Sequence, residues 1–399
     1  MINKNITLQS RTFPSFIKYM GSKTKLIEFI LKGIEHFELK NGVTDLFSGS
    51  CTLAGAIGHS IEIHSNDIQA YSRVLAETYT TSSTSNNCPT PDQIISKAKA
   101  HHKNLLDEIG FNLNYTQNFS VSQLGQMEKK QQELINKTFS NSFHFFTKTY
   151  SGTWWNAEQC AAIDSLRFIA EDYKILPIYP AILASIMHTM AYSSIGTGHY
   201  AQFRDPKTLS NVNNILSYRR KDAFEIFNRK LNEILKWLPR ERSLLSHRTT
   251  ALDYLECLKD SKDGSVVYAD PPYCFVHYSR FYHALETLVL YDQPELQIQG
   301  GDIVKGRYRA SRHQSPFCIQ SKVRRAFKDF FDVANAKNMK IVLSYSNSGM
   351  ISLEELFEII KMSFSAPQIS VLSTNYEHMT LGRKFDRARL VKEVLIIIK

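Results

Sequence analysis

The stretch Val266-Val267-Tyr268-Ala269-Asp270-Pro271-Pro272-Tyr273 is the most distinctive part of the 399-residue chain. It begins with β-branched and aromatic residues, which are typical of a short buried strand. Two consecutive prolines then end the strand, because proline donates no ladder hydrogen bond and fixes its own φ at about −65°. We therefore expect Asp270 to stand in a stiff corner at the carboxyl end of a strand, where open α/β sheets bind ligands.

The chemistry of this corner suits a planar ring that carries an amine. It offers a carboxylate, carbonyls without a competing N–H, and the aromatic ring of Tyr273. Such a ring can stack on a base while the carboxylate and a carbonyl accept hydrogen bonds from an exocyclic amine. Asp270, Pro271, Pro272 and Tyr273 are therefore the candidate catalytic residues. The competing interpretation is a plain turn, with Asp270 as its cap and Tyr273 in the core.

The composition narrows the class of protein. A hydrophobic content of 43% is ordinary for a globular chain. No run of about 20 apolar residues predicts a membrane span. Six scattered cysteines form no CxxC pair, so neither a zinc site nor a disulfide framework is indicated. We expect no metal, no membrane association and a location in a reducing cytoplasm, associated with the nucleoid if the partner is DNA.

The positive charge is concentrated in two segments. The net charge of +10 favours an anionic partner, nucleic acid first. Residues 201–248 hold eleven Lys and Arg against five Asp and Glu, and residues 300–330 hold eight against two. This concentration indicates a binding surface, although solvated helix faces would give a similar pattern. The candidate contacts to nucleic acid are Arg204, Lys207, Arg219, Arg220, Lys221, Arg307, Arg309 and Arg312.

A second candidate site lies near the N-terminus, where Gly21-Ser22 is typical of a turn that caps a helix. Lys23 then falls in the first helical turn, where a cation opposes the helix dipole. Such a cation often has no role, but it can also clamp a bound anion.

Residues 43–67 are typical of a strand, a turn of small residues, a helix and a second strand that ends in an acid. Gly49 and its flanking serines would let a ligand approach the backbone. Asp67 follows Gly49 by 18 residues, a spacing at which nucleoside-binding βαβ units place a carboxylate for ribose hydroxyls. The turn is not a complete G-x-G-x-x-G, and Asp67 would serve equally well as a helix cap. The whole pattern predicts a cofactor that contains a nucleoside.

Residues 72–244 change to a mainly helical pattern. The expected helices are 93–109, 122–137, 157–171, 180–193 and 221–237. The aromatic residues Phe143, Phe145, Phe146, Tyr150, Trp154 and Trp155 are expected to form helical core. The glycine-containing loop 196–207 is the better candidate for touching a partner.

The alternation of strand and helix resumes after residue 245. A strand is expected at 340–346, a helix at 353–361, and strands near 369–374 and 393–398. The segment 274–320 is long, basic and poor in strand signals, which is usual for a functional or mobile connection. We predict a Rossmann-like α/β sheet split between 1–71 and 245–399, with 72–244 as an inserted helical domain that recognises the target.

Five motifs together resemble the Dam-like, D12-class family of DNA adenine-N6 methyltransferases. The matching pieces are Lys18-Tyr19-Met20-Gly21-Ser22-Lys23, Asp45-Leu46-Phe47-Ser48-Gly49-Ser50, Asn66-Asp67-Ile68, Asp253-Tyr254 and Asp270-Pro271-Pro272-Tyr273. Their order also matches the family, with the cofactor motifs before a target-recognition insertion. The glycine motif departs from F-x-G-x-G by ending in Ser50, and residues 72–244 and 274–330 carry no motif of the family.

The resemblance implies S-adenosyl-L-methionine as methyl donor and double-stranded DNA as partner. By position, Tyr19 and Lys23 would hold the methionine end of the cofactor, with Lys23 at its carboxylate. The further cofactor contacts would be Phe47, Ser48, Gly49, Ser50, Asp67, Asp253, Tyr254 and Asp270. The target adenine would leave the duplex and stack on Tyr273.

Three alternatives stay open at the level of sequence. Related enzymes with Asn-Pro-Pro-Tyr act on RNA bases or on protein glutamine, and Ser-Pro-Pro-Tyr suggests cytosine N4. A DNA-binding relative without catalysis is the third alternative, which the intact Asp270, Tyr273, Lys23 and Asp67 disfavour. The resemblance suggests a restriction-modification or phage-defence setting but does not decide whether a cognate nuclease is a partner.

Overall fold

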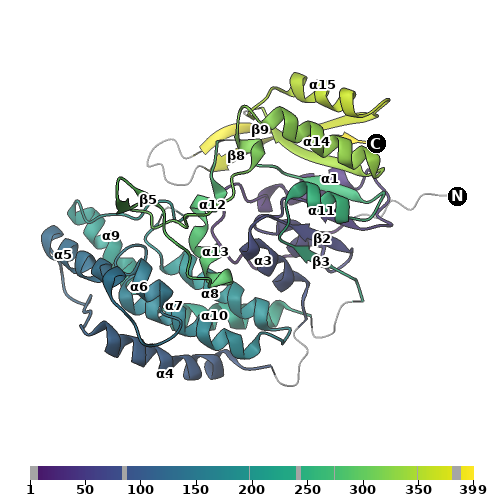
Figure 1. Ribbon diagram of the computed structural model, residues 1–399. Coiled ribbons are helices and arrows are strands. Elements are labelled where there is room, and N and C mark those ends of the chain that lie inside the picture. The colour runs from purple at the N-terminus through teal and green to yellow at the C-terminus, as the bar shows by residue number, and fades with distance from the viewer. Residues whose placement is uncertain are drawn as a thin grey trace.

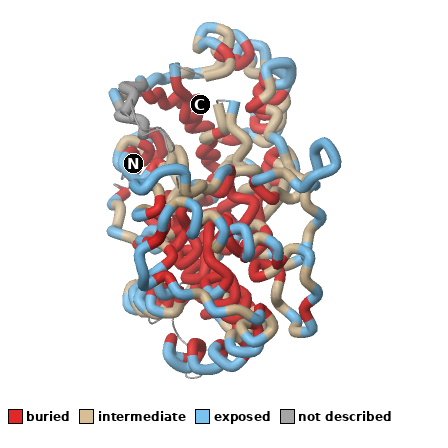
Figure 2. The backbone as a smooth tube through the Cα atoms, turned by 90° about the vertical axis from the view of Figure 1, so that its left-hand side faces the viewer, coloured by how far each residue is buried: buried red, intermediate tan, exposed pale blue. Residues whose placement is uncertain are grey.

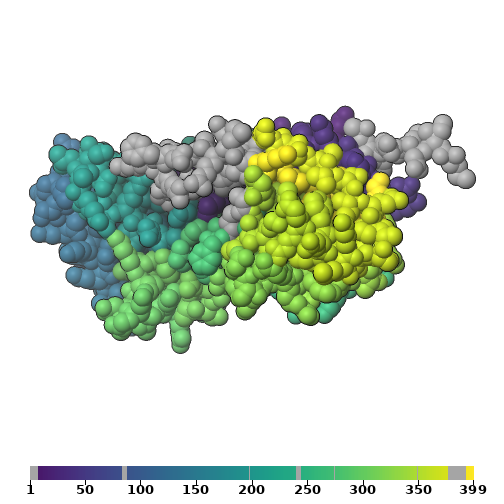
Figure 3. All heavy atoms as spheres, turned by 90° about the horizontal axis from the view of Figure 1, so that it is seen from above, coloured from purple at the N-terminus to yellow at the C-terminus, as the bar shows by residue number. Residues whose placement is uncertain are grey.

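The computed structural model describes residues 8–82, 88–196, 198–239, 244–273, 275–347, 349–379 and 388–399. A twisted sheet with its covering helices lies beside a mainly helical portion (Figure 1). Seen from above, residues of the green part of the chain run along one edge and join the helical end to the yellow C-terminal end (Figure 3).

The described residues form a seven-stranded sheet. Its strands, in spatial order, are β3 (Arg248–Thr250), β2 (Ile63–Asn66), β1 (Val43–Asp45), β4 (Val266–Ala269), β7 (Lys340–Ser346), β9 (Ala388–Ile398) and β8 (Ile369–Met379). The first five pair in parallel, whereas β9 is antiparallel to both of its neighbours. The β1–β4 pair joins the glycine motif to the Asp270 stretch, with Thr44 opposite Val267. A mixed α/β fold with a mostly parallel central sheet is therefore confirmed.

Side chains along β4 alternate between two apolar layers, as the period of two in a strand requires. Val267 and Ala269 face a layer under α11 (Tyr254–Asp260), α14 (Val323–Ala336) and α15 (Leu353–Ser363). Val266 and Tyr268 face the opposite layer, under α1 (Ile27–Ile34) and α2 (Thr52–Ile57). Burial on both faces explains why the β4 sequence is apolar throughout.

The described helical portion contains the five helices that the sequence predicts and two more, α6 (Phe145–Tyr150) and α9 (Leu209–Arg219). The five are α4 (Pro91–Ile109), α5 (Val121–Gln132), α7 (Ala157–Ala170), α8 (Tyr179–Ser193) and α10 (Ala223–Trp237). Short 3-10 turns follow α5 and α7, at Glu133–Asn136 and Glu171–Tyr173. Capping boxes at Thr90, Ser120 and Asn156 fix where α4, α5 and α7 begin. The sequence pattern did not indicate the short α6, nor α9, whose serines and asparagines give it a weak helical pattern.

The helices α4, α6, α7, α8 and α10 share their core with α3 (Ala70–Thr80) and α13 (His283–Leu290). Buried residues of α3 and α13 belong to the same apolar cluster as Trp154, Trp155 and Ile182. Continuous burial through this region is visible as red backbone in the middle of the molecule (Figure 2). The aromatic residues expected in the core are buried, apart from the half-buried Phe143.

The segment 274–320 contributes short elements rather than one loose connection. They are α12 (Tyr278–Phe281), α13, β5 (Ile298–Gln299), β6 (Asp302–Ile303) and a 3-10 turn at Pro316–Cys318. A further 3-10 turn, Thr24–Leu26, precedes α1. The inner part of the loop 196–207 packs on this segment, because the Tyr200 amide donates to the Phe281 carbonyl at 2.7 Å and His199 stacks on Phe281. No helix in the described part of the chain is long and apolar enough to span a membrane.

Candidate active site

One cavity of about 410 Å³ opens at the carboxyl ends of β1, β2 and β4, which is an ordinary size for a small-molecule site. The structure brings every candidate catalytic and cofactor-binding residue to its wall. These are Tyr19, Lys23, Phe47, Ser48, Gly49, Ser50, Asp67, Asp253, Tyr254, Asp270, Pro271, Pro272 and Tyr273. The motifs, which are spread over more than half of the chain, therefore come together around one cavity.

Asp270 stands directly after β4, in the corner expected of the two prolines. Its side chain is 17% exposed, and Lys23 Nζ lies 3.2 Å from its Oδ1. Burial raises the pKa of Asp270 to about 6, although the nearby Lys23 ammonium opposes that rise. Among the described residues, no donor makes a directed hydrogen bond to Oδ1. The buried carboxylate is thus held beside a cation at the wall of the cavity.

Tyr273 presents its ring to the same cavity. Lys23 Nζ lies 5.3 Å from the ring centroid, and Tyr345 meets the ring edge-on with centroids 5.9 Å apart. These contacts fix the ring next to the Asp270 corner.

Lys23 is held by two carboxylates of the chain itself. Its Nζ donates to Glu393 Oε1 at 2.7 Å, in addition to the ion pair with Asp270. Burial alone would lower the pKa of Lys23, but the charges of Asp270 and Glu393 raise it well above its ordinary value. The expected contact between Lys23 and a cofactor carboxylate would therefore require Lys23 to share its ammonium with a third carboxylate.

The glycine turn after β1 is shaped by Tyr19 and Asp67. Gly49 has φ +50, and a Cβ at this position would lie 2.8 Å from the Tyr19 hydroxyl, so only glycine fits. The Gly49 amide donates to Asp67 Oδ2 at 3.0 Å, and the Gln69 amide donates to Oδ1 at the same distance. Burial raises the pKa of Asp67 to about 6 in spite of these bonds. Asp67 thus joins the glycine turn to the residue before α3, whose first amides donate to Glu286 instead, and its carboxylate also lines the cavity.

Asn66 joins the ends of three strands beneath the site. Its Nδ2 donates to the carbonyls of Leu46 and Leu252, at 3.3 and 3.1 Å. Its Oδ1 accepts from Thr250 Oγ1 at 2.7 Å and from the Leu252 amide at 3.1 Å. This buried amide is fully hydrogen-bonded and fixes β1, β2 and β3 relative to one another.

The opposite wall of the cavity is aromatic. Phe47 and Tyr254 stack with centroids 6.1 Å apart, and Phe317 meets both rings edge-on. Asp253 caps α11 by accepting a hydrogen bond from the Leu255 amide at 2.9 Å. An apolar wall with a single acid at its edge suits a flat heterocycle.

Two tyrosines that the sequence analysis did not select support the N-terminal motif. Tyr19 stacks on Tyr278 and Tyr282, with centroids 5.5 and 4.9 Å apart. The Tyr282 hydroxyl accepts from the Met20 amide at 2.7 Å, and the Tyr278 hydroxyl donates to the Met20 carbonyl at 3.2 Å. The segment after Asp270 therefore positions the motif at residues 18–23.

The cavity has the electrostatic character of a site for a cationic ligand. Asp45, Asp67, Asp253 and Asp270 line it, against the single ammonium of Lys23 among the described lining residues. Asp45 Oδ1 is buried without a hydrogen-bond partner among the residues described, and burial raises the pKa of this group well above its ordinary value. Within the described residues, no group of three His, Cys, Asp or Glu is placed to hold a metal.

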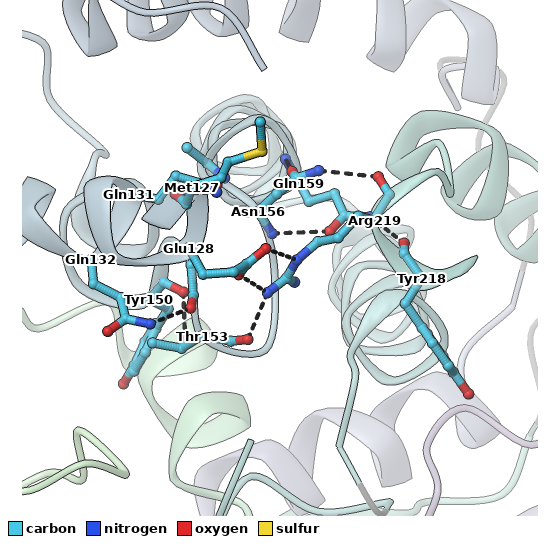
Figure 4. Close-up of polar contacts among 12 residues, drawn as sticks. Met127, Glu128, Gln131, Gln132, Tyr150, Thr153, Asn156, Gln159, Tyr218 and Arg219 are labelled. Carbon is cyan, nitrogen blue, oxygen red and sulfur yellow. Dashed lines mark hydrogen bonds and ion pairs between the residues drawn. The ribbon is translucent and has the colours of Figure 1, made fainter. Parts of the chain in front are cut away.

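The structure corrects the expectation for Arg219. Its guanidinium is buried and donates to both Glu128 oxygens, at 3.0 and 2.5 Å, and to the Thr153 carbonyl at 2.8 Å (Figure 4). Asn156 Nδ2 in turn donates to the Arg219 carbonyl at 3.1 Å. Arg219 stabilises the join between α5, α7 and α9, so it is not available to a phosphate, and its selection as a nucleic-acid contact was wrong.

Arg307 requires the same correction. It is buried and donates to the carbonyls of Thr149 and Gln132, which fixes the segment after β6 against α6 and the last residue of α5. An arginine in a cluster of charge looks the same in a sequence whether its partner is a phosphate or a buried carbonyl, which explains both errors.

The other six basic candidates differ in how far their charges face solvent. Arg204, Lys207 and Arg220 are exposed, although Arg220 also donates to the Tyr115 carbonyl at 2.8 Å. Lys221 donates to the Tyr192 carbonyl at 2.6 Å, Arg309 pairs with Asp292, and Arg312 donates to Gln297. The first three remain candidates for phosphate contacts, but Arg204, which donates to Asn214 Oδ1 at 2.8 Å, and Arg220 would have to exchange a partner, as would the last three.

Comparison with known proteins defines the class to which this fold and cavity belong. The family model described as D12 class N6 adenine-specific DNA methyltransferase matches residues 19–154 and 209–359, which is more than half of the chain. The chain belongs to this family. The resemblance inferred from the five motifs is therefore confirmed.

Individual relatives are modification methylases. The chain is 25% identical over 398 residues to modification methylase LlaI of Lactococcus lactis subsp. lactis, covering 96% of this chain and 55% of the relative. It is also 25% identical over 398 residues to type II methyltransferase M.FokI of Planomicrobium okeanokoites, at 96% and 53% coverage. Modification methylase StsI of Streptococcus sanguinis is 22% identical over 357 residues, at 86% and 46%. The chain spans about half the length of these relatives.

Proposed function

We propose that this protein transfers a methyl group from S-adenosyl-L-methionine to N6 of an adenine that has left duplex DNA. The observation that carries the proposal is the convergence of the Asp270 corner and the Gly49–Asp67 turn on one cavity. Membership of an adenine-specific family supports the base and the atom. The names of the relatives support a restriction-modification setting.

The residues of the cavity are suited to this cofactor. S-adenosyl-L-methionine supplies an electrophilic methyl group on a sulfonium, and it carries an ammonium as a second cationic centre. Asp45, with its unpaired buried Oδ1, is the group suited to the ammonium. Asp67 is suited to ribose hydroxyls, and the stacked Phe47 and Tyr254 are suited to the adenine ring. Tyr19 and the Ser48–Ser50 turn would pass beneath the cofactor, and Asp253 would meet its adenine edge.

Asp270 and Pro271 supply what an adenine amine lacks as a nucleophile. The lone pair of that amine is delocalised into the ring, and two acceptors for its N–H groups favour a pyramidal nitrogen. The Asp270 carboxylate and the Pro271 carbonyl are those acceptors. When the amine gains a carbon it must lose one proton, and the negative Asp270 stabilises the transient positive charge. Tyr273 would stack on the base and offset part of the cost of removing it from the duplex.

The helical portion and the segment 300–330 are proposed to bind the DNA. Arg204, Lys207 and Arg220 carry exposed positive charge that suits phosphate contacts. The boundary of the recognition portion at 72–244 is part of this proposal, and the core that it shares with α13 favours a fixed position for it against the rest of the chain. A partner nuclease and association with the nucleoid belong to the same proposal.

Amine methylation at cytosine N4 or on RNA is the second candidate, because the Asp270 corner would accept hydrogen bonds from any exocyclic amine. The family match favours adenine in DNA. Long-read sequencing of DNA from cells that express the protein separates these candidates. N6-methyladenine at one sequence motif supports the proposal, whereas N4-methylcytosine or unmodified DNA contradicts it.

A further inference from the structure

A buried glutamate lies behind the Asp270 corner. Glu393 on β9 is 2% exposed, and the residues that follow it, Val394 to Ile398, are all apolar and buried. Its carboxylate accepts from Lys23 Nζ at 2.7 Å and from Ser344 Oγ at 2.5 Å. Burying a carboxylate in such a strand costs free energy, and an apolar residue would avoid that cost. A buried acid next to a proposed catalytic acid therefore calls for a chemical explanation.

The two carboxylates engage Lys23 in different ways. The contact to Glu393 is a directed hydrogen bond at 2.7 Å. The contact to Asp270 is an ion pair at 3.2 Å, and Asp270 Oδ1 has no directed hydrogen bond from any described residue. The Lys23 ammonium is thus close enough to attract the Asp270 carboxylate by charge, but its directed hydrogen bond goes to Glu393.

We propose that Glu393 is a positioning residue that takes the hydrogen bond of Lys23 and balances its charge, so that the corner around Asp270 stays net negative toward the target amine. The inference rests on the proposed function and adds a residue to it. Without Glu393, Lys23 would have only Asp270 as a carboxylate partner among the described residues, and its ammonium would neutralise that carboxylate. The site would also lose the net negative charge that stabilises a cationic amine.

Four other titratable groups face Asp270, and the charges that act on its pKa are those of Lys23 and Glu393. They are Tyr268 on β4, Asp45 on β1, Tyr278 on α12 and Tyr273 in the corner itself. Burial raises the pKa of each of the three tyrosines above its ordinary value, which keeps them neutral. Burial also raises the pKa of Asp45, the other carboxyl nearby. Lys23 lowers the pKa of Asp270, whereas Glu393 raises it.

The opposite signs of these two effects define the test. The Asp270 carboxyl is titrated by carbon-13 NMR in the protein without added cofactor, and its resonance is identified by its loss in Asp270→Asn. Glu393→Gln should move the titration below the wild-type value of about 6, and Lys23→Met should move it above that value. Glu358→Gln on α15 removes the same charge at an exposed position and should leave the titration unchanged.

Turnover gives the second readout. Glu393→Gln should lower kcat by about 10- to 100-fold, as is typical when a partner that orients a catalytic group is lost. The acid limb of its pH profile should move down together with the titration. Ser344→Ala, which removes the other hydrogen bond to Glu393, should show a smaller effect in the same direction and serves as the test if Glu393→Gln does not fold. An unchanged titration and unchanged kcat in a folded variant would overturn the proposal. The titration reads the carboxyl itself, so its outcome does not depend on which amine is methylated.

Discussion

The amide of Gly49 donates a hydrogen bond to Asp67 Oδ2 at 3.0 Å, which joins the turn after β1 to the end of β2. The same carboxylate accepts from the Gln69 amide through its other oxygen. Asp67 therefore shapes the glycine turn and also presents a buried negative charge to the cavity. Of the two interpretations of Asp67 from the sequence, the helix cap is wrong, because the first amides of α3 donate to Glu286, and the ribose ligand stays a prediction.

Replacing Asp67 by Asn tests the cofactor half of the site. The amide would keep one acceptor for a backbone N–H but would remove the charge, so the affinity for S-adenosylhomocysteine should fall by about tenfold or more, the cost of one charge-assisted hydrogen bond. Affinity for duplex DNA should change little. Calorimetry measures the affinity for S-adenosylhomocysteine, and a gel-shift assay measures the affinity for DNA. Asp253→Asn removes one carboxylate from the opposite wall of the cavity, and its two affinities are compared with those of Asp67→Asn. An equal loss in both assays would refute the division between cofactor and DNA residues.

Replacing Asp270 by Ala should abolish methyl transfer while the protein stays folded. Removal of a preorganised charged acceptor at the reacting nitrogen is expected to cost on the order of 10²-fold or more in kcat. Single-turnover kinetics with radiolabelled cofactor measure the loss, and circular dichroism confirms the fold. A rate within a few-fold of wild type would contradict the catalytic role of this residue.

The pH dependence of turnover follows from the charge of Asp270. Burial raises its pKa to about 6, and the ionised form is the one that accepts the amine N–H groups. The pKa lies above the ordinary value, so the active form is lost on acidification already near pH 6 rather than near pH 4. A kcat that falls tenfold per pH unit below about 6 is the expected profile. A profile flat down to pH 5 would show that this carboxylate does not control the step.

Arg219 and Arg204 should behave in opposite ways when each is replaced by alanine. Arg219→Ala leaves Glu128 as an unpaired buried carboxylate, so the free energy of unfolding should fall by about 3–5 kcal/mol. Arg204 is exposed, so Arg204→Ala should leave urea unfolding nearly unchanged. Unfolding curves for both variants are the measurement. A stable Arg219→Ala protein would show that the Glu128 network is dispensable.

The exposed cations should set DNA affinity and its salt dependence. Arg204→Ala with Lys207→Ala should weaken binding to all duplexes and flatten the plot of log K against log salt by about one unit per lost phosphate contact. Lys361→Ala on α15 provides a control that removes an exposed cation outside the proposed surface. Binding titrations at several salt concentrations measure the slopes. Equal slopes for the double variant and the control would place the DNA on another face.

The Asp270 corner was predictable because proline chemistry and strand periodicity act locally. The same holds for the turn at Gly49, where the glycine, its flanking serines and the spacing to Asp67 are features of the sequence itself. Glu393 was missed because its partners, Lys23 and Ser344, are brought to it only by the antiparallel addition of β9 to β7. An acid next to an apolar run near the C-terminus was the signal that could have indicated it. Arg219 was misassigned because its partner Glu128 lies on another helix, which no local pattern reveals.

The position of 274–320 also depended on tertiary structure. Tyr278 and Tyr282 contact the motif at residues 18–23 through ring stacking and hydrogen bonds to Met20, contacts that sequence spacing cannot predict. From the sequence, the segment was therefore interpreted as a connection. In the structure it supports the wall of the site.

Mass spectrometry of nucleosides tests the central claim most directly. Purified protein is incubated with duplex DNA and S-adenosyl-L-methionine that carries a deuterated methyl group, and the DNA is digested to nucleosides. The account predicts labelled N6-methyldeoxyadenosine with the wild type and none with Asp270→Ala. A label on N4 of deoxycytidine, or DNA that stays unlabelled while an RNA substrate is methylated, would contradict it.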